Sequence, residues 1–229
     1  MRYFIVILSL LFCSYSVNAQ QAISNDTSEN RLYVGAGLST TSYVLEFSNS
    51  SAGNGSIGGS LEPIITVHLG YNISRRLNLQ LGLGYDKDIE ESNVQYFADE
   101  NDTELTYRNF KLTSKGVIVP ISAQFAPFNL KKRLQFLINL TIAPTLGSVE
   151  LSNIERRSST TTVLADSKES GINVFFVGGI LLKYKLSNRF DTYLEGNILY
   201  KNLHRNSMYA NSRPKSVGIG LQYKFNLSR

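Results

Sequence analysis

The sequence predicts an all-β fold, a single antiparallel, up-and-down transmembrane β-barrel of eight strands with a cleaved N-terminal signal peptide. Three observations lead to this prediction. The chain opens with an export signal, apolar and polar residues alternate along its strand segments, and short connections alternate with long ones.

The start of the chain has the order of a secretory signal peptide. Arg2 precedes an apolar run over residues 4–13, and a small-residue cleavage site ends at Ala19. This run is half the length of about 20 residues that a helix needs to cross a bilayer. We therefore expect a signal peptide over residues 1–19, a short periplasmic tail over 20–30, and a barrel domain over 31–229.

Composition excludes several classes of site. The only cysteine, Cys13, lies in the signal, so the mature chain can form no disulfide and no thiolate metal site. The 23 Lys and Arg exceed the 18 Asp and Glu only mildly, and they do not gather with aromatic residues into a patch. We therefore predict no nucleic-acid partner, and we predict no cofactor or metal.

Alternation with a period of two residues predicts the strands, because successive side chains of a strand point to opposite faces. From Leu77 to Tyr85, every second residue is apolar and those between are small or polar. The same pattern returns over 134–142 and 217–227, and Pro120 predicts a bulge or bend in a fourth segment. Weaker alternation completes eight segments, at 31–47, 62–72, 106–128, 172–186 and 190–200.

The volume of the lumen decides which face points inward. Eight strands enclose a space just wide enough for side chains to fill. The apolar phase of Leu, Ile, Phe and Tyr would overfill it, whereas the opposite phase is rich in glycine. The apolar face is therefore predicted to contact lipid, where only a closed barrel pairs every backbone group of a strand. The inward glycines are Gly35, Gly37, Gly70, Gly82, Gly84, Gly218 and Gly220.

Connection lengths predict the orientation, since bacterial barrels have short periplasmic turns and longer external loops. Short turns are expected at 73–76, 129–133 and 187–189, and long loops at 48–60, 86–104, 149–170 and 201–215. Aromatic residues near the segment ends predict the interfacial girdles. These residues are Tyr71, Tyr85, Tyr184, Tyr200, Tyr223 and Phe225.

The apolar segment Val117-Ile118-Val119-Pro120-Ile121 and the closing strand from Gly218 to Phe225 carry a family resemblance. With the signal and the strand count, they make the whole mature chain resemble the small outer-membrane β-barrel domains of the PorT-like and OmpX-like kind. The resemblance implies an integral outer-membrane protein. The resemblance to PorT-like domains implies a role in an export or envelope-maintenance assembly.

Charged residues on the inward phase predict a polar network in the lumen. Asp191 and Glu195 lie on the seventh segment, and a tight turn should bring Lys185 opposite Asp191. We interpret the set as a salt-bridge network that plugs the barrel, because buried charges need partners; the alternative is a relay or constriction in a narrow pore. Its members are His68, Lys183, Lys185, Asp191, Glu195 and Lys224.

The histidines, the acidic segment and the basic turns give weaker evidence of a functional site. His68 and His204 are the only histidines, and no serine lies in a G-x-S-x-G motif, so His68 is interpreted as a hydrogen-bonded lumen side chain. Segment 86–104 has eight acidic residues and one lysine, which predicts a solvated acidic loop, with calcium as the alternative. The basic short turns and the last loop could meet anionic lipid headgroups.

These observations favour a non-enzymatic outer-membrane protein that binds a partner through its loops or periplasmic rim. Its partners would be outer-membrane lipids and other envelope or secretion-assembly proteins. A narrow channel for small or apolar solutes is the second hypothesis, and a lipid-modifying enzyme is the third.

Overall fold

The computed structural model describes residues 31–49, 55–62, 64–97, 104–128, 133–157, 160–203 and 216–225. The predicted signal peptide (1–19) and tail (20–30) lie outside these residues, as does segment 204–215 with His204. The described strands are β1 (Leu32–Ser39), β2 (Tyr43–Asn49), β3 (Gly55–Leu61), β4 (Ile64–Asn72), β5 (Leu77–Phe97), β6 (Leu105–Ile118), β7 (Ile121–Phe125), β8 (Leu134–Arg157), β9 (Thr160–Lys185), β10 (Phe190–Asn202) and β11 (Ser216–Lys224).

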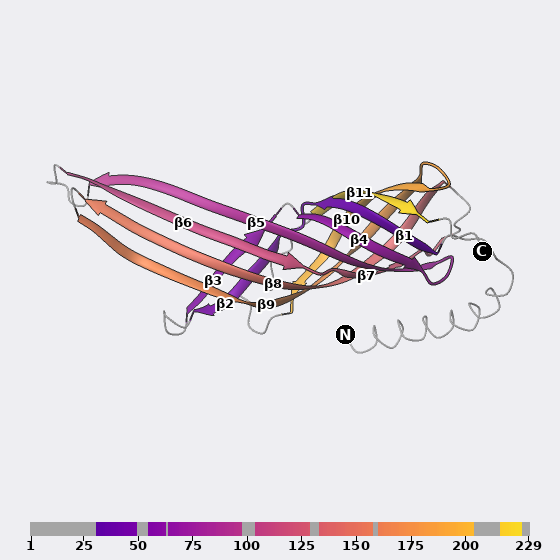
Figure 1. The fold of residues 1–229 in the computed structure, drawn as a ribbon, viewed down its shortest axis with the longest axis horizontal. Helices are drawn as coiled ribbons and strands as arrows, with labels where there is room; N and C mark the ends of the chain where they lie inside the picture. The colour runs from indigo at the N-terminus through magenta and orange to yellow at the C-terminus, as the bar shows by residue number, and fades with distance from the viewer. Residues whose placement is uncertain are drawn as a thin grey trace.

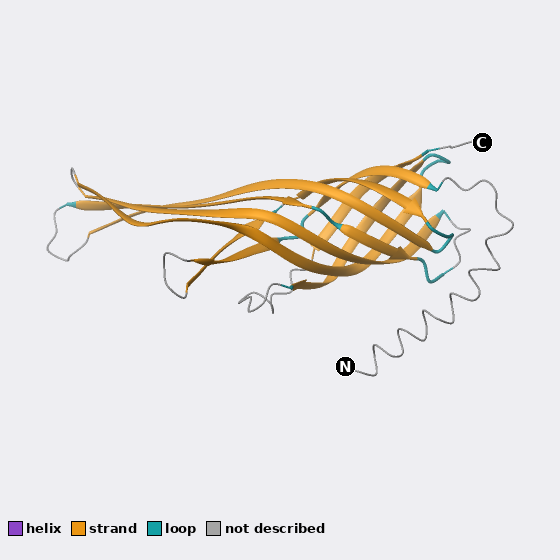
Figure 2. Cartoon of the chain, turned by 60° about the horizontal axis from the view of Figure 1, so that its bottom comes forward, coloured by secondary structure: helices purple, strands orange, loops and turns teal. Residues whose placement is uncertain are grey.

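Nine of these strands form one antiparallel sheet that closes on itself (Figures 1 and 2). β1 pairs with β4 on one side and with β11 on the other, which closes the ring. β6 and β7 both lie between β5 and β8 and so share one position in the ring. The ring therefore has eight positions, which confirms the predicted all-β barrel.

The break between β6 and β7 falls at Pro120, where a bend was predicted. Proline cannot donate to a ladder, but its carbonyl accepts a hydrogen bond from Gly82 N at 2.7 Å. Val119 N donates to Pro144 O at 2.9 Å on the other side. The backbone therefore stays paired across the break, as a strand in lipid requires.

The predicted strand 31–47 is wrong, because the chain leaves the ring after β1. The Thr41 side chain makes hydrogen bonds to Ser39 Oγ at 2.7 Å and Ser216 Oγ at 2.8 Å, and β2 then starts at Tyr43. β2 and β3 form a separate two-stranded sheet, which we name the plug hairpin. Alternating apolar residues fit a lipid-facing strand and a hairpin packed on a core equally well, so the pattern could not separate them.

The predicted long loops at 86–104 and 149–170 are also wrong, because strands continue through most of them. β5 runs on to Phe97 and β8 to Arg157, and β9 already begins at Thr160. We name this extension the arm, made of residues 86–97, 105–116, 147–157 and 160–171. Outside lipid both faces of a strand can be polar, so these segments lack the alternation that marks a membrane strand.

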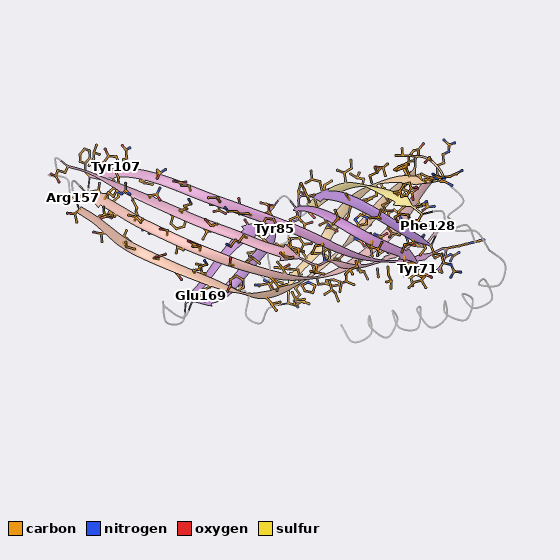
Figure 3. All side chains as sticks on the ribbon, viewed as in Figure 1. Tyr71, Tyr85, Tyr107, Phe128, Arg157 and Glu169 are labelled. Atoms are coloured by element: carbon orange, nitrogen blue, oxygen red, sulfur yellow. The ribbon has the colours of Figure 1, made fainter. Side chains whose placement is uncertain are left out.

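The arm projects from one end of the barrel (Figure 1). Twelve residues of β5 at about 3.3 Å each span about 40 Å. Tyr85 lies where the arm leaves the barrel, Tyr107 and Arg157 lie at its far end, and Tyr71 and Phe128 lie at the opposite end of the barrel (Figure 3). The arm therefore continues the barrel on the side away from the short turns.

The outer face of the barrel is an apolar belt, as predicted. On β5, Leu79, Leu81 and Leu83 are 44%, 54% and 53% exposed, while Gly82 and Gly84 on the opposite phase are buried. The same alternation continues on β4 and β11. None of the described residues forms a helix that is long and apolar enough to cross a membrane.

Two arginine substitutions on the same face of β5 should separate the belt from the arm. We expect Leu81→Arg to cost about 2–4 kcal/mol of stability, because the charge enters the apolar belt. Ile89→Arg lies on the exposed arm and should change stability by less than about 0.5 kcal/mol. Urea unfolding in liposomes measures both, and equal losses would show that the belt does not face lipid.

Candidate functional site

The lower lumen, near the short turns, holds an ion pair between two of the residues named as lumen candidates. Asp191 on β10 is 1% exposed, and its Oδ2 lies 2.7 Å from Lys224 Nζ. Asp191 is directly opposite Gln222 on β11, so Lys224 reaches it diagonally from two residues along the strand. A buried carboxylate needs such a partner, because desolvation strongly disfavours an unpaired charge.

The two lysines of β9 lie differently, although they share the inward phase. Lys183 is buried, and its Nζ lies 5.3 Å from the centroid of the Tyr33 ring, where it can form a cation–π interaction. Lys185 is opposite Asp191 in register, as expected, but its side chain is exposed. Lys185 is the last residue of β9, so it stands at the barrel rim, where water solvates it.

Neither Glu195 nor His68 is a partner in the Asp191–Lys224 ion pair. Glu195 Oε1 accepts a hydrogen bond from Asn139 Nδ2 at 2.8 Å. His68 is 3% exposed, lies between the rings of Tyr33 and Tyr193, and has Gln222 Nε2 3.4 Å from its Nε2. None of these His68 neighbours is a serine or a carboxylate, the partners that a catalytic histidine would use.

The inward glycines make room for the large side chains of the lumen. A Cβ at Gly35 would collide with the His68 ring, and a Cβ at Gly70 would collide with Tyr33. A Cβ at Gly37 or Gly220 would collide with Tyr193. The prediction that the glycine-rich phase faces a crowded interior is therefore confirmed.

At the upper end of the lumen, the plug hairpin, which the sequence did not predict, packs against the arm and the mouth of the barrel (Figure 1). Tyr43, Leu45, Phe47, Ile57 and Leu61 of the hairpin are all buried. They form one apolar cluster with residues of the barrel and arm. Those partners are Ile64, Ile118, Ala143, Val149, Phe175, Val177 and Tyr200.

Tyr200 was expected in an aromatic girdle but belongs to this cluster. It is 8% exposed, and its ring centroid lies 5.7 Å from that of Phe175 and 6.4 Å from that of Tyr43. β10 has a register shift between Asn197 and Leu199, which places Tyr200 on the inner face. A bulge cannot be seen in a period-two pattern, so the pattern assigned Tyr200 to the wrong face.

Side chains of the barrel satisfy the backbone of β2. Val44 N donates to Tyr200 Oη at 3.1 Å, and Val44 O accepts from Asn202 Nδ2 at 3.2 Å. Asn173 Nδ2 donates to Glu46 O at 3.3 Å. An unpaired buried backbone group costs as much as a lost hydrogen bond, so these contacts let a strand edge lie inside the barrel mouth.

Three glycines form the surface on which the plug hairpin rests. Gly116, Gly147 and Gly171 are directly opposite one another on β6, β8 and β9. A Cβ would lie 2.9 Å from Leu61 Cδ1 at Gly116, 2.5 Å from Leu45 Cδ1 at Gly147, and 3.1 Å from Phe47 Cε1 at Gly171. The hairpin therefore packs directly against the backbone where the arm begins.

Burial also changes the chemistry of the plug. Desolvation raises the pKa of Tyr43, and the neighbouring Glu195 and Tyr200 raise this pKa further. The Tyr43 hydroxyl is therefore neutral at any physiological pH.

The far end of the arm combines polar cross-links with exposed apolar side chains. Arg108 Nε donates to Asn153 Oδ1 at 3.0 Å, and Arg157 Nε lies 3.7 Å from Glu104 Oε2. Tyr96 Oη donates to Glu155 Oε2 at 2.7 Å, and this hydrogen bond raises the pKa of Tyr96. An open groove of about 800 Å³ lies here, lined among others by Asn93, Gln95, Tyr107, Arg108, Ile154 and Arg156.

The acidic residues of segment 86–104 do not converge on one point. Because they lie on a strand, Asp86, Asp88 and Glu90 share one face and Glu91 lies on the other. Among the described residues, no three candidate metal ligands lie together. Residues 98–103, which include three more acidic residues, lie outside the part of the chain that the structure describes.

Residues 5–225 match the protein family described as outer membrane protein beta-barrel domain. No curated protein matches the chain in sequence. Among solved structures, the chain is similar to Neisserial surface protein A, at 18% identity over 87% of this chain and 100% of that one, with a TM-score of 0.37.

Two further structures show the same level of likeness. The N-terminal β-barrel domain of Pseudomonas aeruginosa OprF is 13% identical over 87% of this chain and 100% of its own, with a TM-score of 0.37. Ail, the attachment invasion locus protein of Yersinia pestis, is 10% identical over 86% of this chain and 100% of its own, with a TM-score of 0.40.

The ion pair of the lower lumen should be visible in a double-mutant cycle. Asp191→Ala leaves an ammonium without its carboxylate, and we expect a loss of about 3 kcal/mol, the low end for a buried pair because Lys224 is partly exposed. Adding Lys224→Met to this variant should restore part of the loss. Unfolding in liposomes measures the cycle, and strictly additive losses would mean that the two charges do not interact.

The contact between plug and arm can be tested with a single added side chain. Gly147→Val should displace Leu45 and cost about 1–3 kcal/mol, the usual cost of overpacking. Gly196→Val is the matched control, because a Cβ there would meet only Ile180 Cγ1, at 3.9 Å. Thermal unfolding and limited proteolysis should show a less stable, cleavable hairpin in the first variant only.

Proposed function

This chain belongs to the outer membrane protein beta-barrel domain family, and on that premise we propose that it acts by binding a partner through its arm, without catalysing a reaction. It is an integral protein of the outer membrane. The proposed partner is another protein of the cell envelope or of a secretion assembly.

The direction of the arm follows from the turns. Connections 73–76 and 186–189 are short and lie at the end of the barrel away from the arm. Bacterial barrels place their short turns in the periplasm, so the arm extends from the cell surface. Of the two binding surfaces expected from the sequence, loops and periplasmic rim, we favour the external one.

The arm is the observation that carries the proposal. Its four strands are paired along their length, from Asp86 opposite Gly116 to Arg157 opposite Thr160. Such a sheet presents side chains at fixed positions, so a partner loses little entropy in ordering it. The groove at the far end offers exposed Tyr107 beside two arginines and several amides, a combination suited to polar and stacking contacts with a partner surface.

The lumen supports binding over conduction. The plug hairpin packs an apolar cluster against the upper mouth, and aromatic rings and an ion pair lie in the lower lumen. A conducting pore would need a continuous polar path through both regions. The contacts of His68 likewise give no support to a hydrolytic site.

The arm can be shortened by cutting its four strands at one row of register partners, which leaves the plug hairpin unchanged. Glu91, Lys111, Ser152 and Asp166 are directly opposite one another, so removing residues 92–110 and 153–165 and joining the ends with Asn-Gly turns keeps the ladder in register. Heat-modifiable migration on gels would show that the shortened barrel still folds.

We expect full-length protein, cross-linked in intact cells, to capture an envelope partner that the shortened variant does not capture. In planar bilayers, neither protein should show unitary conductance. Stable unitary conductance of the full-length protein would overturn the proposal in favour of a channel, and equal capture by both variants would exclude the arm as the binding surface.

A further inference from the structure

Outward-facing side chains form regular rows where the arm leaves the barrel. Tyr85, Val117, Leu146 and Ile172 are cross-strand neighbours on β5, β6, β8 and β9. All four are exposed, so they form the upper edge of the apolar belt. The next outward row, which we name the rim row, consists of Lys87, Lys115, Ser148 and Ser170.

Two like charges stand directly opposite each other in the rim row. Lys87 and Lys115 are register partners on neighbouring strands, and both are exposed. Cβ atoms of such partners lie about 5 Å apart, and like charges at this distance destabilise a sheet. An anion between the two ammonium groups would turn this repulsion into attraction.

The described carboxylates nearby do not supply that anion. Glu150, one row further out, forms an ion pair with Lys168 at 3.6 Å, and Glu91 accepts a hydrogen bond from Asn109 at 3.0 Å. Asp86 and Asp88 lie on the opposite face of the sheet from the lysines. Within the described part of the chain, neither Lys87 nor Lys115 has an ion-pair partner.

The height of the rim row matches that of lipid phosphates. The nine residues of β5 from Leu77 to Tyr85, tilted by about 40°, rise by about 23 Å, close to the apolar band of about 25 Å in such barrels. Lys87 lies two residues further along, which adds about 5 Å. This is the level of the headgroups of the outer leaflet.

We propose that Lys87 and Lys115 bind the phosphate of a phosphorylated glycolipid in the outer leaflet. The hydroxyls of Ser148 and Ser170 continue the row and can bond to the sugar of the headgroup. Val117, directly below, contacts the acyl chains. This site is separate from the groove at the far end of the arm and does not depend on the partner bound there.

Binding of bis-phosphorylated lipid A to the purified full-length protein in a zwitterionic detergent tests the site. The variant Lys87→Gln with Lys115→Gln should bind about thirtyfold more weakly, because each lysine–headgroup contact contributes about fivefold in affinity. The matched control is Lys111→Gln with Lys168→Gln, which removes the same charge from the same face further from the belt, and its affinity should be unchanged. Native mass spectrometry reads the bound lipid.

Two comparisons make the result decisive. Lipid A stripped of both phosphates should bind the wild-type protein no better than the rim variant binds the intact lipid. Without lipid, the rim variant should melt at a higher temperature than the wild type, because the repulsion is gone, and lipid A should reverse this order. Equal losses in the rim and control variants, or equal binding of the dephosphorylated lipid, would overturn the site.

Discussion

The pairing of backbone groups in lipid is the constraint on which the rest of the structure depends. No water reaches the hydrocarbon to bond with a free N–H or carbonyl, so the strands must close into a ring, and β1 meets both β4 and β11 to close it. Closure with eight positions fixes a narrow lumen. The narrow lumen in turn favours glycine opposite the inward rings of the lower lumen, as Gly70 is to Tyr33. The belt outside and the crowding inside are thus two results of one requirement.

This constraint applies only within the hydrocarbon of the membrane. Beyond the membrane surface, the composition of the strands therefore changes. Above Tyr85 the strands stay paired but are no longer obliged to be apolar, and polar contacts such as Tyr96 with Glu155 join them. The glycine row at the base of the arm lets the plug hairpin approach the backbone closely, so its leucines and Phe47 reach the barrel mouth. The plug hairpin thereby packs on the base of the arm and on the barrel mouth through a single apolar cluster.

The sequence predicted the parts of the fold that lipid enforces and failed where lipid is absent. The belt of β5 and the bend at Pro120 follow from alternation and from the chemistry of proline. The alternation placed Asp191 and Lys224 on the inward phase, but the turn pointed to Lys185 as the partner of Asp191, whereas Lys224 forms the ion pair. The arm and the plug were missed, since polar strands in water carry no period-two signal and a packed hairpin carries the same signal as a membrane strand. The bulge beside Leu199 was equally invisible, and it moved Tyr200 from the girdle to the core.

The place of the plug hairpin in the chain has a further consequence. β1 and β4 are neighbours in the ring, and Ser39 at the end of one is already opposite Ile64 at the start of the other. The segment between them can therefore be viewed as a cassette inserted into a connection that a tight turn could make. Its removal would leave every barrel pairing in register. Evolution can thus lengthen, exchange or delete this hairpin without redesigning the barrel wall, so that descendants with and without it share one scaffold.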